Sequence, residues 1–341
     1  MQLEPQEPFA TPQPKPRIPA HFTRKSLLGA SGLIAFMLAM FLVPAGINYW
    51  LWMHSTWPWW GCLAASLPLF VIAGQGVHLM GWVAHDGFHL TFHSNPRVSA
   101  VIALFFSSMT LVFYESGMAI DHWSHHRFAN TEHDPDLRLL RRYRTFWGRM
   151  FGQRNRANAH YFRRALHLAL GRPLPPEISN VRLPFRPPVM RALAVLNLLF
   201  ALGWLLTYLH VETLLPGSIW ICVAVPLVVS GWLSGLRSFT EHAHTGVGDL
   251  HNTRSRTHWL FTLIDYGGNY HLEHHLYPSV PQWRLPALHR WLVQHGFYDR
   301  LPDPSVIDPH LSVYRYTLAR YEYGRKSSAP RETAVPSPVH P

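Results

Sequence analysis

The chain has 341 residues, of which 48% are hydrophobic and only 14% are charged. A soluble domain usually has about 25% charged residues, so this composition excludes an ordinary soluble protein and favours a membrane protein. The net charge of +11 does not indicate a nucleic-acid partner, because the basic residues lie between and outside the apolar runs, as membrane topology requires. Two cysteines, Cys62 and Cys222, are too few for a disulfide framework or an iron–sulfur cluster.

The two ends of the chain differ from the rest. Residues 1–26 are basic and rich in proline, with no long apolar run. They predict a disordered cytoplasmic tail without a cleavable signal peptide. Residues 321–341 are predicted to form a second disordered tail. Residues 27–320 between them are expected to form one membrane domain.

Four apolar runs predict four transmembrane helices, at residues 27–50, 57–82, 190–209 and 216–236. Each is long enough to cross the roughly 30 Å of hydrocarbon, which takes about 20 residues. The connectors within each pair contain neither Lys nor Arg, whereas fourteen Arg lie between residues 122 and 191. By the positive-inside rule, the runs form two hairpins with cytoplasmic termini and a cytoplasmic helical cap, residues 83–189 and 237–320.

A fifth apolar run, residues 98–120, does not fit this scheme. If it crossed the bilayer, His89 and His122 would lie on opposite sides. We therefore predict that the run is re-entrant or interfacial. Ser107, Ser108 and Gly117 favour a break within it.

Three clusters of histidine stand out: HDGFH at residues 85–89, HWSHH at 122–126 and HLEHH at 271–275. Spacings of three and four residues place side chains on one face of a helix. Imidazole suits iron, copper and zinc, and eight imidazoles exceed what one ion accepts. The clusters therefore predict a site for two metal ions, with the ligands His85, His89, His122, His125, His126, His271, His274 and His275.

Isolated histidines outside the clusters are interpreted as structural or surface residues; examples are His21, His54, His160, His167, His289, His295 and His310. A metal-bound imidazole usually donates its second N–H to a carboxylate or carbonyl group. The acidic residues in or near the clusters are candidates for that role: Asp86, Glu132, Asp134, Asp136, Glu241, Asp249, Asp265 and Glu273. For each of them, a surface position or an ion pair with arginine is the alternative. Asn252 and Arg254 are expected to order the loop before the last cluster.

The segments HDGFH, HWSHHRFANTEHDPD and NYHLEHHLYP resemble the three-histidine-box signature of the membrane fatty-acid desaturase superfamily. This superfamily also contains hydroxylases and carotenoid-modifying enzymes, and the resemblance covers about residues 80–285. It implies an all-α integral membrane protein whose cytoplasmic helical cap holds two ferrous ions on the eight box histidines. It also implies a further ligand after the fourth span, for which His242 is the candidate and His244 the rival.

The resemblance implies that O₂ is a co-substrate and that the substrate is a long apolar chain. Desaturation of an acyl chain is the first expectation. Hydroxylation or ketolation of a carotenoid or lipid is the alternative, and the HDPD stretch has parallels in the carotenoid-modifying branch. A sphingolipid or specialised-metabolite substrate is a further possibility. A histidine-rich metal transporter is an alternative of another class, but transporters place their ligands near the middle of the bilayer.

Two expectations concern the surroundings of the site. The sequence contains neither an HPGG haem-binding stretch nor a cysteine cluster, so a separate ferredoxin, rubredoxin or cytochrome is expected to supply electrons. The arginine-rich segment offers a surface for an acidic carrier. After the last box, Leu285, Leu288 and Leu292 predict one apolar face of an amphipathic helix that lies along the membrane or closes the cap.

Overall fold

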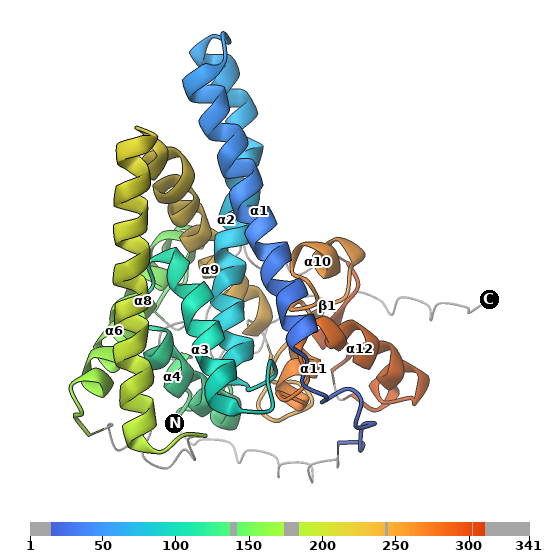
Figure 1. Cartoon of the computed structure of the whole chain (residues 1–341). Coiled ribbons are helices and arrows are strands. Elements are labelled where there is room, and N and C mark those ends of the chain that lie inside the picture. The colour runs from blue at the N-terminus through green and yellow to red at the C-terminus, as the bar shows by residue number, and fades with distance from the viewer. Residues whose placement is uncertain (1–14, 137–141, 174–183, 243–244, 302, 311–341) are drawn as a thin grey trace, which may run out of the picture.

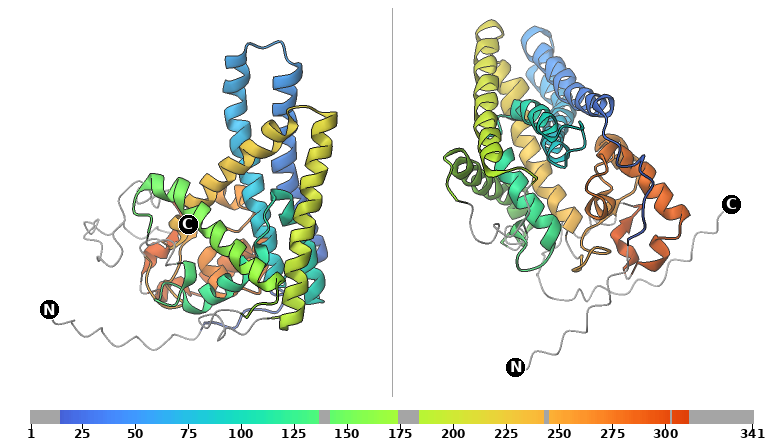
Figure 2. Two further views of the ribbon diagram at one scale, coloured as in Figure 1. Left: turned by 90° about the vertical axis from the view of Figure 1, so that its left-hand side faces the viewer. Right: turned by 60° about the horizontal axis from the view of Figure 1, so that its bottom comes forward.

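Two long helical hairpins stand on a helical cap (Figure 1, Figure 2). The structure is a computed structural model that describes residues 15–136, 142–173, 184–242, 245–301 and 303–310. The first hairpin consists of α1 (Leu27–His54) and α2 (Trp59–Phe88). The second consists of α8 (Pro187–Leu214) and α9 (Val225–His242), which continues from a π-helical segment, Ile219–Ala224. The described residues thus contain four helices that are long and apolar enough to cross a membrane.

Local sequence explains how the first hairpin forms. Ser26 caps α1, because its hydroxyl accepts a hydrogen bond from the backbone nitrogen of Gly29 at 3.0 Å. A Cβ atom at Gly76 would lie 2.5 Å from the backbone nitrogen of Phe41, so only glycine allows α2 to approach α1 this closely. The last turn of α2 extends beyond the predicted end at residue 82 and carries His85.

The fifth apolar run folds back on itself. It forms α3 (Pro96–Ser107), a short 3₁₀ turn (Ser108–Thr110) and α4 (Glu115–Phe128), and the two helices are bent by 114° relative to each other. Leu111 in the bend adopts a left-handed backbone with φ 55°. The predicted break at Ser107 and Ser108 is therefore confirmed.

Gly117 has a different role from the one predicted. It lies inside α4, and a Cβ atom there would be 2.2 Å from the backbone oxygen of Tyr161. Its small size lets α4 pack on α6 (Arg154–Ala169), so the prediction that Gly117 interrupts the helix is wrong.

Several elements build the cap at the base of the hairpins. They are the π-helical segment Gly148–Gln153, α6, α10 (Trp259–Ile264), α11 (His271–Leu276), α12 (Leu285–Gln294), and 3₁₀ turns at Gln282–Arg284, Tyr298–Arg300 and Pro304–Val306. One of them, α10, lies beside the first hairpin (Figure 1). Strands β1 (Ser255–Arg256) and β2 (Ile307–Asp308) pair in parallel. Leu285, Leu288 and Leu292 of α12 are buried in one apolar cluster, so the predicted amphipathic helix closes the cap.

The described part of the N-terminal tail packs on this cap. Lys15 Nζ donates a hydrogen bond to the carbonyl of Leu276 at 2.8 Å, and the hydroxyl of Tyr277 donates to the carbonyl of Pro16 at 2.7 Å. Phe22 is buried in the same apolar cluster as α12. The prediction of a disordered tail is therefore wrong for residues 15–26, because Phe22 supplies the packing. Residues 1–14 and 311–341, including the predicted C-terminal tail, lie outside the described residues.

Candidate metal centre

The three histidine clusters converge where the hairpins meet the cap. The first lies at the end of α2, the second on α4 and the third on α11. The Nε2 atom of His122 lies 3.0 Å from that of His89 and 2.9 Å from that of His126. The Nε2 atoms of His126 and His274 are 3.0 Å apart. Segments far apart in the sequence therefore place their imidazoles in direct contact.

The ring nitrogens form two groups in which one nitrogen of each residue lies within 4.8 Å of every other. The first group contains His85, His89, His122, His126 and His274, and the second contains His125, His242 and His275. His271 lies beside the second group, with its Nε2 atom 3.1 Å from Nε2 of His242. His244, the rival of His242, lies outside the described residues.

Oxygen acceptors of the protein contact the Nδ1 atoms of several imidazoles. Three Nδ1 atoms are held in this way: that of His85 by Asp86 Oδ1 at 3.2 Å, that of His125 by both carboxylate oxygens of Asp134 at 3.0 Å, and that of His242 by the carbonyl of Asn252 at 3.2 Å. An acceptor at Nδ1 favours the tautomer that carries its proton there. The lone pair of Nε2 is then available to a metal ion.

Unpaired ring nitrogens provide a test of whether metal fits these residues. In the eight box histidines and His242, the buried ring nitrogens without a hydrogen-bond partner among the described residues are Nε2 of His85, Nδ1 of His126, Nδ1 of His271 and both ring nitrogens of His275. A buried polar atom left unpaired costs about 1–3 kcal/mol. Bound metal would remove this cost at the nitrogens that coordinate it, and an all-imidazole donor set suits iron, copper or zinc.

The imidazoles of α11 are in the protonation state that binds metal. Burial, reinforced by the neighbouring imidazoles, lowers the pKa of His271, His274 and His275 well below its usual value. They are therefore neutral at pH 7, and neutral imidazole is the form that coordinates a metal ion.

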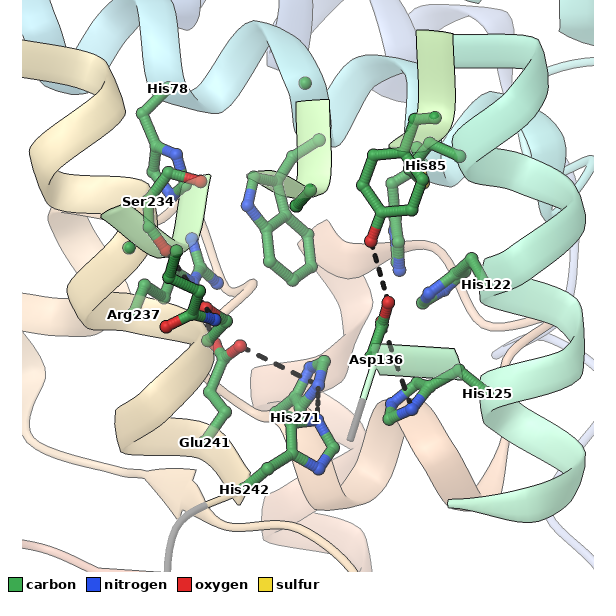
Figure 3. Close-up of a pocket in the computed structure, with 18 of the residues that line it drawn as sticks. His78, His85, His122, His125, Asp136, Ser234, Arg237, Glu241, His242 and His271 are labelled. Carbon is green, nitrogen blue, oxygen red and sulfur yellow. Dashed lines mark hydrogen bonds and ion pairs between the residues drawn. The ribbon is translucent and has the colours of Figure 1, made fainter. Parts of the chain in front are cut away.

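Two further predicted carboxylates lie near the histidines. Asp136 Oδ2 is 4.0 Å from Nδ1 of His125, and Glu241 Oε2 is 3.7 Å from Nε2 of His271 (Figure 3). Asp136 also accepts a hydrogen bond from the hydroxyl of Tyr161 at 2.7 Å. Burial, the largest influence, raises the pKa of Asp136 above its usual value.

Asp265 and Glu273 do not have the predicted role. Asp265 forms ion pairs with Arg256 at 2.9 Å and Arg237 at 3.6 Å. Glu273 accepts hydrogen bonds from His289, Ser255 and Tyr298. Among the described residues, these contacts place neither carboxylate on a box histidine or on His242. Glu273 lies on the face of α11 opposite its histidines, and Asp265 faces the two arginines. The candidates Glu132 and Asp249 are exposed.

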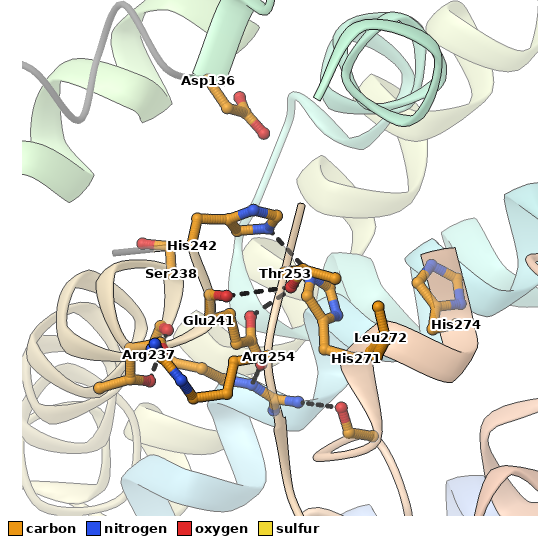
Figure 4. A network of polar contacts seen from close by, with 12 residues as sticks. Asp136, Arg237, Ser238, Glu241, His242, Thr253, Arg254, His271, Leu272 and His274 are labelled. Atoms are coloured by element: carbon orange, nitrogen blue, oxygen red, sulfur yellow. Dashed lines mark hydrogen bonds and ion pairs between the residues drawn. The ribbon is translucent and has the colours of Figure 1, made fainter. Parts of the chain in front are cut away.

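The loop between α9 and β1 is attached to the end of α9 (Figure 4). The backbone carbonyl of Glu241 accepts hydrogen bonds from Thr253 Oγ1 at 3.0 Å and from the backbone nitrogen of Arg254 at 2.9 Å. The Arg254 side chain donates to the carbonyls of Thr240 and Ser305. These contacts confirm the predicted ordering role of Arg254. Asn252 contacts His242 through its backbone carbonyl, so the role of its side chain stays a prediction.

Sequence analysis missed several residues of the site. Gln282 donates its backbone N–H to Asp86 Oδ2 at 2.9 Å. Arg237 forms an ion pair with Glu241 at 2.7 Å, and its guanidinium lies 3.8 Å from the ring of Trp82. The contacts of Gln282 with Asp86 and of Arg237 with Trp82 join residues from separate elements, so no local motif marks them. The pair of Arg237 and Glu241 lies on one helix at a spacing of four residues, which is a local signal that could have indicated it.

A cavity of about 160 Å³ opens onto the histidines, between α2, α4, α6 and α9 (Figure 3). Its histidine wall consists of His78, His85, His122, His125, His242 and His271. The remaining wall includes Gly81, Trp82, Met118, Tyr161 and Ser234. Charged and polar side chains also line it: Glu115, Asp136, Gln153, Arg237, Ser238 and Glu241. The cavity therefore has both apolar and polar walls next to the imidazoles.

The fold and the site define a helical protein with hairpins long enough to span a membrane and a buried polyhistidine centre. Residues 56–303 match the model of the family described as Fatty acid desaturase, and the chain belongs to this family. It is 29% identical over 285 residues to a beta-carotene ketolase of Paracoccus sp. (strain N81106 / MBIC 01143), covering 79% of this chain and 93% of that protein. It is 28% identical over 263 residues to a beta-carotene ketolase of Paracoccus sp. (strain PC1), covering 75% of this chain and 90% of that protein.

These similarities confirm the predicted superfamily of membrane desaturases and hydroxylases. The chain is therefore an oxidoreductase, and the metal transporter considered as an alternative is not favoured.

Proposed function

We propose that the chain oxidises a ring methylene of a carotenoid or related isoprenoid to an alcohol or ketone, with O₂ as co-substrate. The observation that carries this proposal is the similarity to two beta-carotene ketolases along 93% and 90% of their lengths. In each round of oxidation, one oxygen atom of O₂ would go to carbon and the other to water, with two electrons and two protons supplied from outside. A ketone requires a second round at the same carbon.

The proposed metal is iron, held as two ions by the nine histidines: His85, His89, His122, His125, His126, His242, His271, His274 and His275. When bound, iron would supply the redox chemistry with O₂ that no side chain supplies. Asp86 and Asp134 orient the imidazoles that they contact. Zinc matches the donors but has no redox chemistry.

The cavity supports a substrate with a bulky end group. Gly81 lies one turn before His85 on α2, and no atom lies within 4 Å of the position that its Cβ would occupy. A side chain at position 81 would therefore extend into open space on the side of α2 that lines the cavity. Trp82 and Met118 supply apolar contacts, which favour an isoprenoid end group over water.

Desaturation of a long acyl chain is the second candidate function. The description of the matching family supports it, because this description names fatty acid as the substrate. The first candidate is preferred because the two curated relatives are beta-carotene ketolases, and the open space at Gly81 leaves room for a ring.

We further propose that the cap and both termini are cytoplasmic and that an external carrier delivers the electrons. Exposed arginines on the described cap, among them Arg142, Arg144, Arg156 and Arg163, support docking of an acidic ferredoxin. The predicted domain boundaries stay part of this proposal, except that residues 15–26 pack on the membrane domain.

The function is tested by expressing the chain in a host that accumulates beta-carotene and analysing the total lipid extract by mass spectrometry. The His274→Ala variant is the control. We expect an oxygenated carotenoid with the wild-type chain and none with the variant. Loss of two hydrogens from an acyl chain, with unchanged carotenoids, would instead establish the second candidate.

A further inference from the structure

Helix α10 lies beside the first hairpin rather than at its base (Figure 1). The residues that end this helix contact α1 and α2 directly. Gln75 Nε2 donates hydrogen bonds to Asp265 Oδ1 at 2.8 Å and to the carbonyl of Ile264 at 3.4 Å. The rings of Tyr266 and Phe36 lie 4.9 Å apart. These contacts fix the height of α10 along the hairpin.

The rise of a helix per residue gives the distance between α10 and the membrane interface. The tip of the hairpin carries exposed tryptophans, including Trp50 and Trp59, as expected at a membrane interface. At 1.5 Å per residue, Gln75 lies about 24 Å along α2 from Trp59, and Phe36 lies about 21 Å along α1 from Trp50. Both values are smaller than the roughly 30 Å of hydrocarbon. The end of α10 is therefore at a depth that lipid chains occupy.

The outer face of α10 is apolar. The side chains of Trp259, Leu260 and Leu263 are 68%, 39% and 56% exposed, whereas Phe261 points inward beneath the guanidinium of Arg256. Large exposed apolar patches of this kind mark sites of interaction with a membrane or another apolar surface.

This patch has the same depth as the exposed apolar surface of the first hairpin. Val71 and Ile72 lie one turn before Gln75 on α2, and they are 52% and 43% exposed. A lipid layer that covers these two residues would also surround α10. The outer face of α10 and the exposed face of α2 are therefore both apolar and lie at the same depth.

We propose that α10 is inserted into the hydrocarbon of the bilayer and that lipid acyl chains cover Trp259, Leu260 and Leu263. The inference rests on the proposed spanning role of α1 and α2. Residues 265–270 connect α10 to α11, so the inserted helix ties the third histidine cluster to the membrane. The partner of this surface is the lipid bilayer and not a second copy of the chain.

Spin-label accessibility in phosphatidylcholine vesicles tests this proposal. Cys62 and Cys222 are replaced by alanine, and a nitroxide is attached to Leu263→Cys. Two control positions have similar exposure, Leu206 on α8 (57%) and Val293 on α12 (51%). Frequent collisions of the nitroxide with O₂ indicate that it lies in lipid, and frequent collisions with a water-soluble nickel chelate indicate that it lies in water. Circular dichroism establishes that each labelled protein is folded.

We expect the label at residue 263 to resemble that at residue 206, with high O₂ and low nickel accessibility, whereas residue 293 is accessible to nickel. Nickel accessibility at 263 with lipid exposure at 206 would overturn the insertion of α10 alone. Low accessibility to both reagents at 263 would mean a protein contact and would also overturn it. Nickel accessibility at 206 would contradict the proposed spans themselves.

Discussion

The Nε2 atoms of His89 and His122 lie 3.0 Å apart, although 33 positions separate the two residues in the chain. The 114° bend between α3 and α4 makes this contact possible, because it returns the fifth apolar run to the end of the hairpins from which it started. The proposed metal centre therefore depends on the turn at residues 108–114 as much as on the histidines.

Asp134 is expected to set the metal affinity of His125. Its two oxygens accept from Nδ1 of His125 at 3.0 Å, and Asp134→Asn removes the charge while keeping the shape. Loss of such a partner typically costs about 10–100-fold in metal affinity. Competition with a chelator measures this change. Glu132→Gln, at an exposed neighbouring position, should leave the affinity unchanged, and equal affinities of the two variants would exclude the role of Asp134.

Gly81 is expected to determine which substrates fit. Gly81→Leu would fill open space in the cavity, so turnover of a substrate with a ring should fall on the order of 100-fold, as misplacement by about 1 Å does. The metal content should stay at the wild-type level. Gly203→Leu is the matched control, because Gly203 on α8 also has no neighbour within 4 Å but does not line the cavity. Unchanged turnover in Gly81→Leu would place the substrate elsewhere.

Glu273 is expected to stabilise the fold rather than to bind metal. Burial opposes its ionisation, but hydrogen bonds from His289, Ser255 and Tyr298 outweigh burial and lower its pKa. Glu273→Gln should reduce the free energy of unfolding by about 1–3 kcal/mol at pH 7.

The contribution of Glu273 to the free energy of unfolding should decrease as the pH falls. The folded state has the lower pKa, so the contribution of Glu273 is present above the unfolded pKa of about 4.3 and is lost as the pH falls through the folded value. Thermal unfolding of the wild type and of Glu273→Gln should therefore differ at neutral pH and converge in acid. A difference that grows in acid would contradict this account.

The sequence predicted the helices and the histidine site because both have short-range signals. Apolar runs of sufficient length indicate the four long helices, and spacings of three and four residues place the histidines of each cluster on one face. The requirement that His89 and His122 share a site was enough to predict the return of the fifth run.

The contacts around the histidines could not be predicted in the same way. Tyr161 with Asp136 and Gln282 with Asp86 are pairs between separate elements, and their partners depend on the packing of the whole cap. Glu273 was assigned to the site because it lies between His271 and His274 in the sequence. On helix α11, however, its side chain lies on the face opposite the histidines.

The metal content of the purified protein tests the central claim most directly. Iron and zinc are measured by mass spectrometry in the wild type, in His274→Ala, and in His295→Ala as a control outside the site. The account predicts two iron ions per chain in the wild type and in the control, and a clear loss of iron in His274→Ala. Full iron content in His274→Ala, or a wild-type protein that binds zinc and no iron, would contradict it.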